Sequence, residues 1–267
     1  MWDQIQIRVS GRADAPTLIF LPGLHGDWTL IGSFKASLGK TVRFVEITYP
    51  RTTSWTLAQY AEGVLAALAG AGITSGWLLL ESFGSQIGWE LLKQASASPR
   101  VTSFSPSGVI MAGGFVRYPV LWMVPVVRTI NRKMPMSLVR LCCRVYAAYA
   151  RLRHRRAPET LGDVSDFVKN RTVEEDRQAV AYRYRLIVES NPCEVAREAR
   201  LPVYQLVGFF DPIVPWWPVR LWLKRNCESY RGWRVIFRAD HNVLGTAPQE
   251  SARQVLDWMG VSPTTFT

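Results

Sequence analysis

A serine at the junction of an apolar strand and a helix is the first group in this chain that could do chemistry. The segment LLLESFGSQIGWELL, residues 78–92, runs from the strand through Ser82 directly into the helix. Such a turn exposes a nucleophilic hydroxyl, and N–H groups at the start of the helix can stabilise an oxyanion. Gly84 supplies one of the two small residues that this turn needs, whereas Leu80 occupies the other position. We predict that Ser82 is a nucleophile and Phe83 N–H an oxyanion donor; alternatively, Ser82 only caps the helix.

A glycine-bearing loop after another apolar strand offers a second oxyanion donor. In LIFLPGLHGD, residues 18–27, Gly23 and Gly26 follow the strand and let the backbone approach a substrate closely. We predict that Leu24 N–H is the second donor and that His25 contacts the substrate. The alternative is an ordinary turn at the end of a strand.

A serine nucleophile needs a base, and the chain has three histidines. His154 lies in the cationic run ARLRHRRA, which lowers its proton affinity and favours a solvated position. His25 belongs to the predicted oxyanion loop. His241 follows the predicted strand WRVIFRA and precedes the last predicted helix, where a base would be carried at the edge of a sheet. We therefore predict that His241 is the base.

The third member of such a triad is a carboxylate that orients the imidazole. Asp211 in GFFDPIVP follows an apolar strand and lies in a turn held by two prolines, so we predict that it fills this role. Asp240 is the alternative, but side chains of adjacent residues in extended backbone, such as Asp240 and His241, point apart. The same reasoning places Glu81 on the opposite side of the turn from Ser82.

Short β-rich runs alternate with helical segments, which is typical of a mostly parallel sheet covered by helices. The predicted strands are 4–9, 16–21, 42–48, 77–81, 107–112, 202–208 and 233–238, and the predicted helices are 55–70, 83–96, 216–226 and 247–259. The alternation stops at 115–200, which is helical and basic. We expect a core formed by residues 1–114 and 201–267, with 115–200 inserted between its two parts.

Four segments in this order resemble the α/β-hydrolase superfamily across nearly the whole chain. LPGLHG is similar to the oxyanion loop, ESFGS to the nucleophile turn, GFFDPIVP to the acid turn and ADHNVL to the histidine loop. The resemblance implies an α/β-hydrolase fold, with a mostly parallel central sheet flanked by helices and an inserted helical cap over the serine. The insertion at 115–200 matches that cap, and we place Trp122 and Trp216 with His25 at the substrate pocket.

The activity that this resemblance implies is that of a carboxylesterase-like serine hydrolase. Its substrate would be a small-molecule carboxylic ester with an apolar acyl or alcohol part, and the reaction requires no metal or organic cofactor. C–C bond hydrolysis, thioester cleavage and acyl transfer on the same triad stay open, because the triad does not define the bond that is cleaved. A ligand-binding protein with slow turnover also stays open. Epoxide hydrolysis is disfavoured, because those relatives have an aspartate where Ser82 stands.

The chain of 267 residues is 48% hydrophobic and carries a formal net charge of +11, which invites a nucleic-acid or membrane-surface partner. Most of this charge falls in the insertion, where 17 Lys and Arg face nine Asp and Glu. Between Arg117 and Arg156, ten basic residues are interleaved with apolar ones and no acidic residue occurs. An anionic membrane surface, an acidic substrate or water alone could face them. No nucleic-acid motif is present, so we expect no nucleic-acid partner.

The cellular setting is predicted from the cysteines and the first residues. Four cysteines without a CxxC pair argue against a disulfide framework and a structural zinc site. The N-terminal residues alternate like a strand rather than forming an apolar run. We therefore expect a cytoplasmic protein; its oligomeric state stays open.

Overall fold

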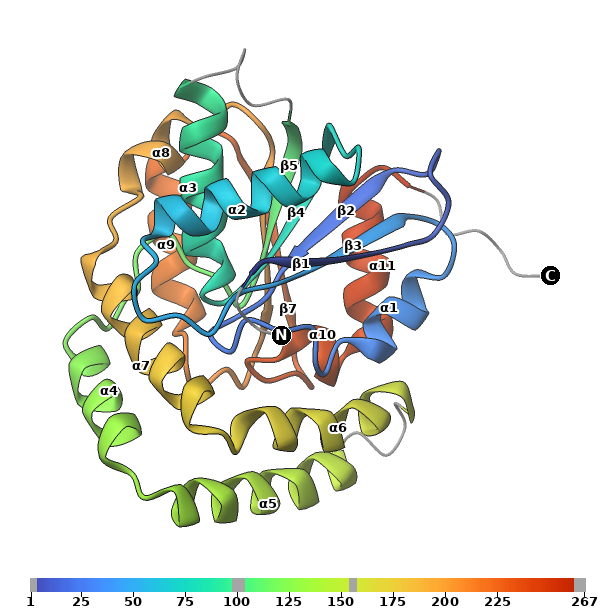
Figure 1. The fold of residues 1–267 in the computed structure, drawn as a ribbon. Helices are drawn as coiled ribbons and strands as arrows, with labels where there is room; N and C mark the ends of the chain where they lie inside the picture. Colours follow the sequence, from blue (N-terminus) through green and yellow to red (C-terminus); the bar gives the residue numbers. More distant parts are fainter. Residues whose placement is uncertain (1–3, 98–103, 154–157, 262–267) are drawn as a thin grey trace.

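The computed structural model describes residues 4–97, 104–153 and 158–261 (Figure 1). Within these residues one sheet of seven strands has the order β1-β3-β2-β4-β5-β6-β7. β1 pairs antiparallel with β3, and every other pair is parallel. The strands are β1 (Gln6–Ser10), β2 (Thr17–Leu21), β3 (Arg43–Thr48), β4 (Ser75–Glu81), β5 (Ser105–Ala112), β6 (Val203–Gly208) and β7 (Tyr230–Ile236). The predicted mostly parallel sheet is confirmed.

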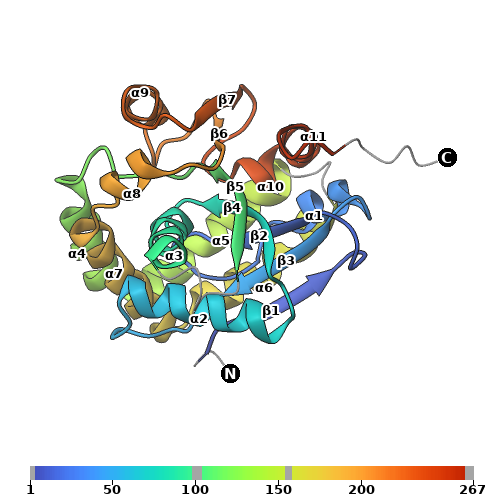
Figure 2. The ribbon, with the colours of Figure 1, turned by 90° about the horizontal axis from the view of Figure 1, so that it is seen from above.

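Helices cover both faces of the sheet, as Figure 2 shows from above. On one face lie α2 (Leu57–Gly70), α3 (Gly84–Ala97) and α9 (Trp216–Asn226); on the other lie α1 (Gly32–Leu38), α10 (Val243–Thr246) and α11 (Pro248–Trp258). The alternation of side chains along β4 divides the core accordingly. Leu78 and Leu80 pack into the first face and Leu79 into the second.

The seven predicted strands and four predicted core helices are all present; helix 216–226 has the predicted ends, and the others have shifted ends. β7 begins at Tyr230 rather than 233, because an edge strand that pairs only with β6 tolerates the exposed Arg231 and the half-buried Gly232. The sequence did not predict α1. With seven residues, of which only Phe34 and Leu38 are buried and apolar, it is too short for a helical period to stand out.

Among the described residues, five helices lie between β5 and β6, so the predicted helical insertion is confirmed. They are α4 (Met123–Lys133), α5 (Met136–Arg153), α6 (Pro158–Arg171), α7 (Glu174–Glu189) and α8 (Cys193–Glu198). α4 packs on α7 and α5 on α6, so that α6 and α7 form an inner pair and α4 and α5 an outer pair (Figure 1). No helix in the described ranges is long and apolar enough to cross a membrane.

Candidate active site

Ser82 lies in a strained turn between β4 and α3. Its φ is 47°, in the left-handed region that residues with a side chain rarely adopt. The turn is held on both sides, because Ser82 N–H donates to the Ala112 carbonyl at 3.1 Å and Ser85 Oγ donates to the Ser82 carbonyl at 2.6 Å. This conformation turns the chain out of the sheet and directly into α3.

Two glycines of α3 explain how the turn fits against its neighbours. A Cβ on Gly84 would lie 2.3 Å from the Leu21 carbonyl oxygen, so only glycine lets the helix start this close to the end of β2. A Cβ on Gly88 would lie 2.5 Å from Cδ1 of Leu80. A small residue is usual at the position of Leu80. The larger leucine fits here because the facing helix has a glycine, Gly88, that leaves space for its side chain.

The structure brings Ser82, His241 and Asp211 together at the carboxyl ends of three strands. His241 Nε2 lies 3.0 Å from Ser82 Oγ, and His241 Nδ1 lies 2.8 Å from Asp211 Oδ2. The buried Asp211 carboxylate also accepts hydrogen bonds from the N–H groups of Ile213 and Val214, at 2.8 and 2.9 Å. Asp211 is thus held by its own loop in the orientation that meets the imidazole.

The surroundings of His241 favour its protonated form. Burial alone lowers the pKa of an imidazole, but the hydrogen bond and the charge of Asp211 raise it, with smaller contributions from Glu81 and Asp240. The net effect raises the pKa of His241 above its ordinary value. Its Nε2 is therefore suited to accept a proton from Ser82 Oγ.

Glu81 lies on the same side of the turn as Ser82, so the prediction that it points to the opposite side is wrong. Its Oε2 accepts a hydrogen bond from Gly23 N–H at 3.0 Å, and a Cβ on Gly23 would lie 3.4 Å from both Glu81 Oε2 and Ser82 Cβ. The alternation of a strand requires extended backbone at both residues, and the left-handed φ of Ser82 ends it. Burial raises the pKa of Glu81, against the Gly23 hydrogen bond and the charge of His241.

The loop after β2, which holds the predicted oxyanion donor Leu24, lies against the turn, since a Cβ on Gly23 would lie 3.4 Å from Ser82 Cβ. Phe83, the other predicted donor, directly follows Ser82. Within the described residues, neither Leu24 N–H nor Phe83 N–H donates a hydrogen bond. The loop is anchored by Arg183 of α7, which is fully buried and donates from Nη1 to the Leu24 carbonyl at 2.8 Å and from Nη2 to the Pro50 carbonyl at 2.9 Å. The peptide group that follows the predicted donor is therefore held by the inner pair.

A buried ionic cluster extends this anchor to the next residues of the loop. Arg171 at the end of α6 donates to Asp27 Oδ2 at 2.7 Å and to Asp176 Oδ1 at 3.1 Å, and all three side chains are almost fully buried. His25 Nδ1 lies 3.2 Å from Asp176 Oδ2. His25 thus joins the loop to α7, an arrangement that leaves its predicted contact with the substrate as a prediction.

Proteins of known structure share the fold of this chain. No protein-family model and no curated protein matches the sequence. An enol-lactonase from Burkholderia xenovorans LB400 matches with a TM-score of 0.72 and 17% identity, over 96% of both chains. The esterase RhEst1 from Rhodococcus sp. ECU1013 matches with a TM-score of 0.71 and 18% identity, over 97% of this chain and 95% of that one. An alpha/beta hydrolase enzyme from a Medee basin deep-sea metagenome library matches with a TM-score of 0.74 and 12% identity, over 98% and 96%. The chain has the α/β-hydrolase fold. The predicted resemblance is thereby confirmed at the level of the fold.

The residues predicted to line the substrate pocket, and the alternative candidate for the acid, lie at separate places on this α/β-hydrolase fold. Trp122 precedes α4 and is 75% exposed, and the Trp216 ring stacks on Trp233 of β7 with centroids 5.8 Å apart. Their part in substrate binding stays a prediction. Asp240 accepts a hydrogen bond from Asn242 N–H at 3.0 Å, as expected of a residue that stabilises a loop. His154 lies outside the described residues.

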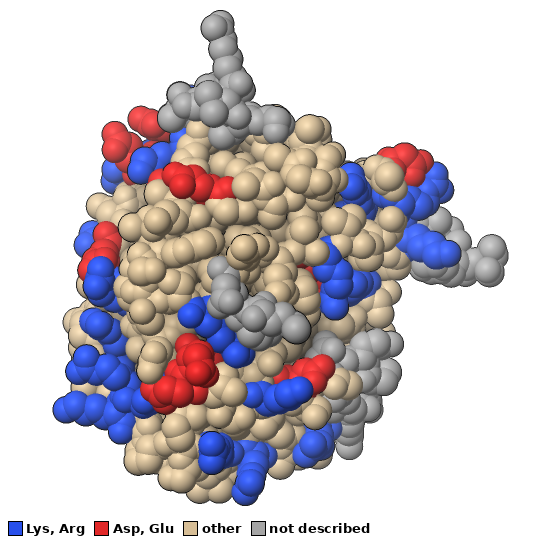
Figure 3. All heavy atoms as spheres, in the orientation of Figure 1, with Lys and Arg blue, Asp and Glu red and all other residues tan. Residues whose placement is uncertain are grey.

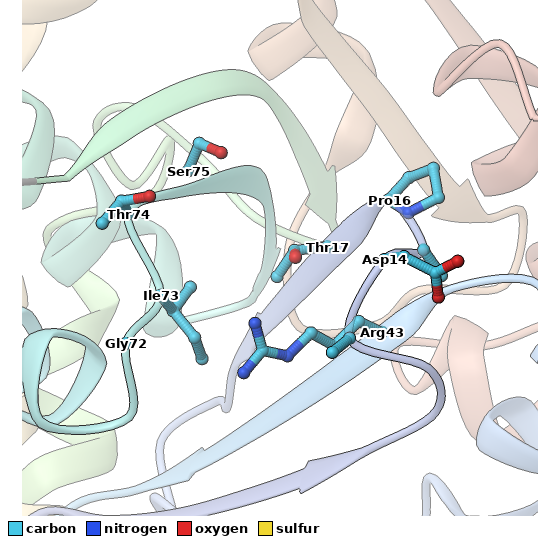
Figure 4. Close-up of a pocket in the computed structure, with 10 residues that line it drawn as sticks. Asp14, Pro16, Thr17, Arg43, Gly72, Ile73, Thr74 and Ser75 are labelled. Atoms are coloured by element: carbon cyan, nitrogen blue, oxygen red, sulfur yellow. The ribbon is translucent and has the colours of Figure 1, made fainter.

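A hollow lies at the opposite edge of the α/β-hydrolase sheet from Ser82 (Figure 4). It is lined at the amino ends of β2, β3 and β4 by Thr17, Arg43 and Ser75, and the Arg43 guanidinium extends toward Ile73. None of the predicted catalytic residues lines it. Ligands of open α/β sheets bind at the carboxyl ends of the strands, so the triad and not this hollow is the candidate active site.

Proposed function

We propose that this protein is a serine hydrolase that cleaves carboxylic esters. Its proposed substrate is a small-molecule ester with an apolar acyl part. The observation that carries the proposal is the continuous hydrogen-bonded chain from Ser82 Oγ through His241 to Asp211. The solved esterases and the enol-lactonase of the same fold support it, since lactones are cyclic esters.

The geometry supports a two-stage reaction. Ser82 Oγ attacks the ester carbonyl carbon while His241 Nε2 accepts the serine proton and then donates it to the leaving alkoxide oxygen. The product alcohol departs and an acyl group stays on Ser82. A water molecule then attacks this acyl group, its proton passes to His241 and on to Ser82 Oγ, and the carboxylic acid is released. Asp211 orients the imidazole and stabilises its positive charge.

Leu24 N–H and Phe83 N–H would stabilise the negative charge that develops on the carbonyl oxygen. Phe83 N–H lies directly after the nucleophile, and Leu24 N–H belongs to the loop that packs against the start of α3. Each such donor contributes about 3 kcal/mol to the stability of a transition state. Both groups are backbone donors, so their position depends on how the turn and the loop are held.

Hydrolysis of p-nitrophenyl esters of rising acyl length, together with a lactone series, tests this proposal. Ser82→Ala should lower kcat/KM about 10⁴-fold or more, because the nucleophile is lost. Ser54→Ala, at an exposed serine in the loop before α2, is the matched control and should keep the wild-type rate. Wild-type rates in Ser82→Ala would contradict the mechanism. A stoichiometric burst of alcohol without sustained turnover would instead indicate a ligand-binding protein.

The pH profile of kcat/KM tests the role of His241. Because its pKa is raised and the base must be neutral, the rate should fall as pH falls through a value above the ordinary histidine pKa of about 6.5. Glu81→Gln removes a negative charge that contributes to this pKa, so the acid limb should move to lower pH. An acid limb at the same pH in Glu81→Gln would contradict the assignment.

A further inference from the structure

The outer helix α5 presents an apolar stripe to solvent along most of its length. Leu141, Val145 and Leu152 are exposed to 54%, 61% and 70%, and Leu138 and Tyr149 on the same side are also exposed. Large apolar side chains in such a row on a helix normally face a core. Here they do not, because α5 packs on α6 through a different side.

The positions around α5 divide it into three sectors. With about 100° per residue, the buried and half-buried side chains occupy one sector of about 100°: Val139, Cys143, Tyr146, Ala147 and Ala150. The exposed Arg140, Arg144 and Arg151 share a narrow sector next to it. The apolar stripe occupies a further sector of about 80°. The helix therefore has two apolar sides. One packs against the protein, and the other is exposed and bordered by arginines.

The preceding outer helix α4 repeats this arrangement. Val124 is buried against the protein, while Met123, Val126, Val127 and Ile130 are exposed on the other side of the helix. Arg132 and Lys133 end the helix and are also exposed. Trp122, directly before α4, is the most exposed large apolar residue of the described chain. Both helices of the outer pair thus combine exposed apolar residues with cations.

The charge of this surface has one sign. No acidic residue occurs from Arg117 to Arg156, and Figure 3 shows Lys and Arg spread over α4 and α5 at the left and lower edges of the molecule. Across the described residues, Arg140, Arg144 and Arg151 take part in no ion pair. A second copy of the chain on the same stripe would bring like charges together.

We propose that the outer pair α4–α5 docks on the surface of an anionic lipid bilayer, with its apolar stripe at the level of the headgroups and its arginines on the lipid phosphates. Interfacial helices combine these two features, and each cation near an anionic surface strengthens binding. The helices would lie on the surface and not span it. The proposal does not depend on the chemistry at Ser82, because α4 and α5 form the layer outside the inner pair.

Vesicle sedimentation tests the docking of the whole protein. Vesicles of phosphatidylcholine with about 30 mol% phosphatidylglycerol are compared with vesicles of phosphatidylcholine alone, at about 0.05 M and about 0.5 M salt. We expect binding to the anionic vesicles at low salt that falls at least about tenfold in neutral vesicles and at high salt. No binding to anionic vesicles at low salt would overturn the proposal.

Paired variants separate the contribution of this surface to vesicle binding from the contribution of general hydrophobicity and net charge. Leu141→Gln/Val145→Gln should lower the partition coefficient about tenfold, whereas Leu221→Gln/Val188→Gln, at exposed apolar positions of α9 and α7, should not. Arg140→Gln/Arg144→Gln/Arg151→Gln should lower it at least about tenfold. Its control with the same loss of charge changes exposed residues of α9 and α11: Lys224→Gln/Arg225→Gln/Arg253→Gln. Equal losses in a variant and its control would overturn the proposal.

Light scattering tests whether the stripe is instead an interface between two copies of the chain. If the wild-type protein is a dimer and Leu141→Gln/Val145→Gln is a monomer, the stripe is an interface between two copies and the proposal is overturned. Circular dichroism and the Tm of each variant show that a loss of binding is not a loss of folding. A monomer that binds anionic vesicles through this stripe supports the proposal.

Discussion

The inner and the outer helices of the insertion are both rich in arginine, yet they use it in opposite ways. In the inner pair, Arg171 and Arg183 are buried and hydrogen-bonded to a carboxylate or to backbone carbonyls of the loops after β2 and β3, and Arg171 also to Asp176 of α7. In the outer pair, Arg140 and Arg144 are exposed beside an apolar stripe. A charge excluded from water must be matched by partners, whereas an exposed one is stabilised by solvent. The inner arginines therefore join the insertion to the core, and the outer ones are free to meet a partner.

The largest effect should come from breaking the buried cluster. Arg171→Met leaves Asp27 and Asp176 buried without their shared cation, so the free energy of unfolding should fall by about 3 kcal/mol. Denaturant unfolding followed by circular dichroism measures this loss. Arg144→Met in the outer pair is the control and should stay within about 0.5 kcal/mol of wild type. Similar losses in the two variants would remove the distinction between the pairs.

Arg183→Lys should affect catalysis more than stability. A lysine replaces the two separated guanidinium nitrogens that reach the Leu24 and Pro50 carbonyls with one ammonium on a shorter side chain, so the peptide at the predicted oxyanion donor should loosen and kcat should fall about tenfold, with a smaller change in KM. Arg185→Lys, on the same helix at an exposed pair with Glu189, should keep the wild-type kcat. This prediction rests on the proposed ester hydrolysis, and an unchanged kcat in Arg183→Lys would show that the inner pair does not position the loop.

Acid should weaken the inner pair selectively. Burial opposes ionisation of Asp176, but the charges and hydrogen bonds of His25, Arg171 and Arg51 outweigh it and lower its pKa. A lowered folded-state pKa contributes stability above the ordinary aspartate pKa of about 3.9, and this stability is lost as pH falls through the folded value. The difference in free energy of unfolding between wild type and Asp176→Asn should therefore shrink as pH falls below about 4. Urea unfolding from pH 7 to 3.5 measures it, and a constant difference would contradict the prediction.

The smallest effect should come from the outer stripe in solution. Leu141→Gln/Val145→Gln changes side chains that already face water. The free energy of unfolding without lipid should therefore stay within about 0.5 kcal/mol of wild type, as is usual for surface substitutions, and Tm should change little. Differential scanning calorimetry measures it. A large loss would mean that the stripe packs against the protein, and the contrast with the inner pair would then disappear.

Much of the core could be predicted because its signals are local. The strands around β4 are short, nearly continuous buried apolar runs between helical segments, the apolar run before Ser82 leads into a helix, and Asp211 and His241 each follow a strand. Parallel strands bring their carboxyl ends to one edge of a sheet, so residues that follow different strands meet there. Leu80 looked like a departure, and Gly88, eight positions further on, compensates for it.

Other features depended on contacts between distant residues. Arg171 meets Asp27 across 144 positions and Arg183 meets Leu24 across 159, and no period in the sequence links these residues. Glu81 faces the active site because a left-handed residue follows it, which a strand pattern does not reveal. The buried arginines of α6 and α7 looked like the exposed ones of α4 and α5, since burial is not a property of residue type.

Local patterns in the chain thus specified the alternating elements, the order of the candidate triad residues and the basic, helical character of the insertion. Each of these follows from the identity and spacing of neighbouring residues. Folding alone decided which arginines are buried, where Glu81 points, and that one apolar side of α5 stays in water. Those features depend on which surfaces meet, and only packing across the whole chain determines that.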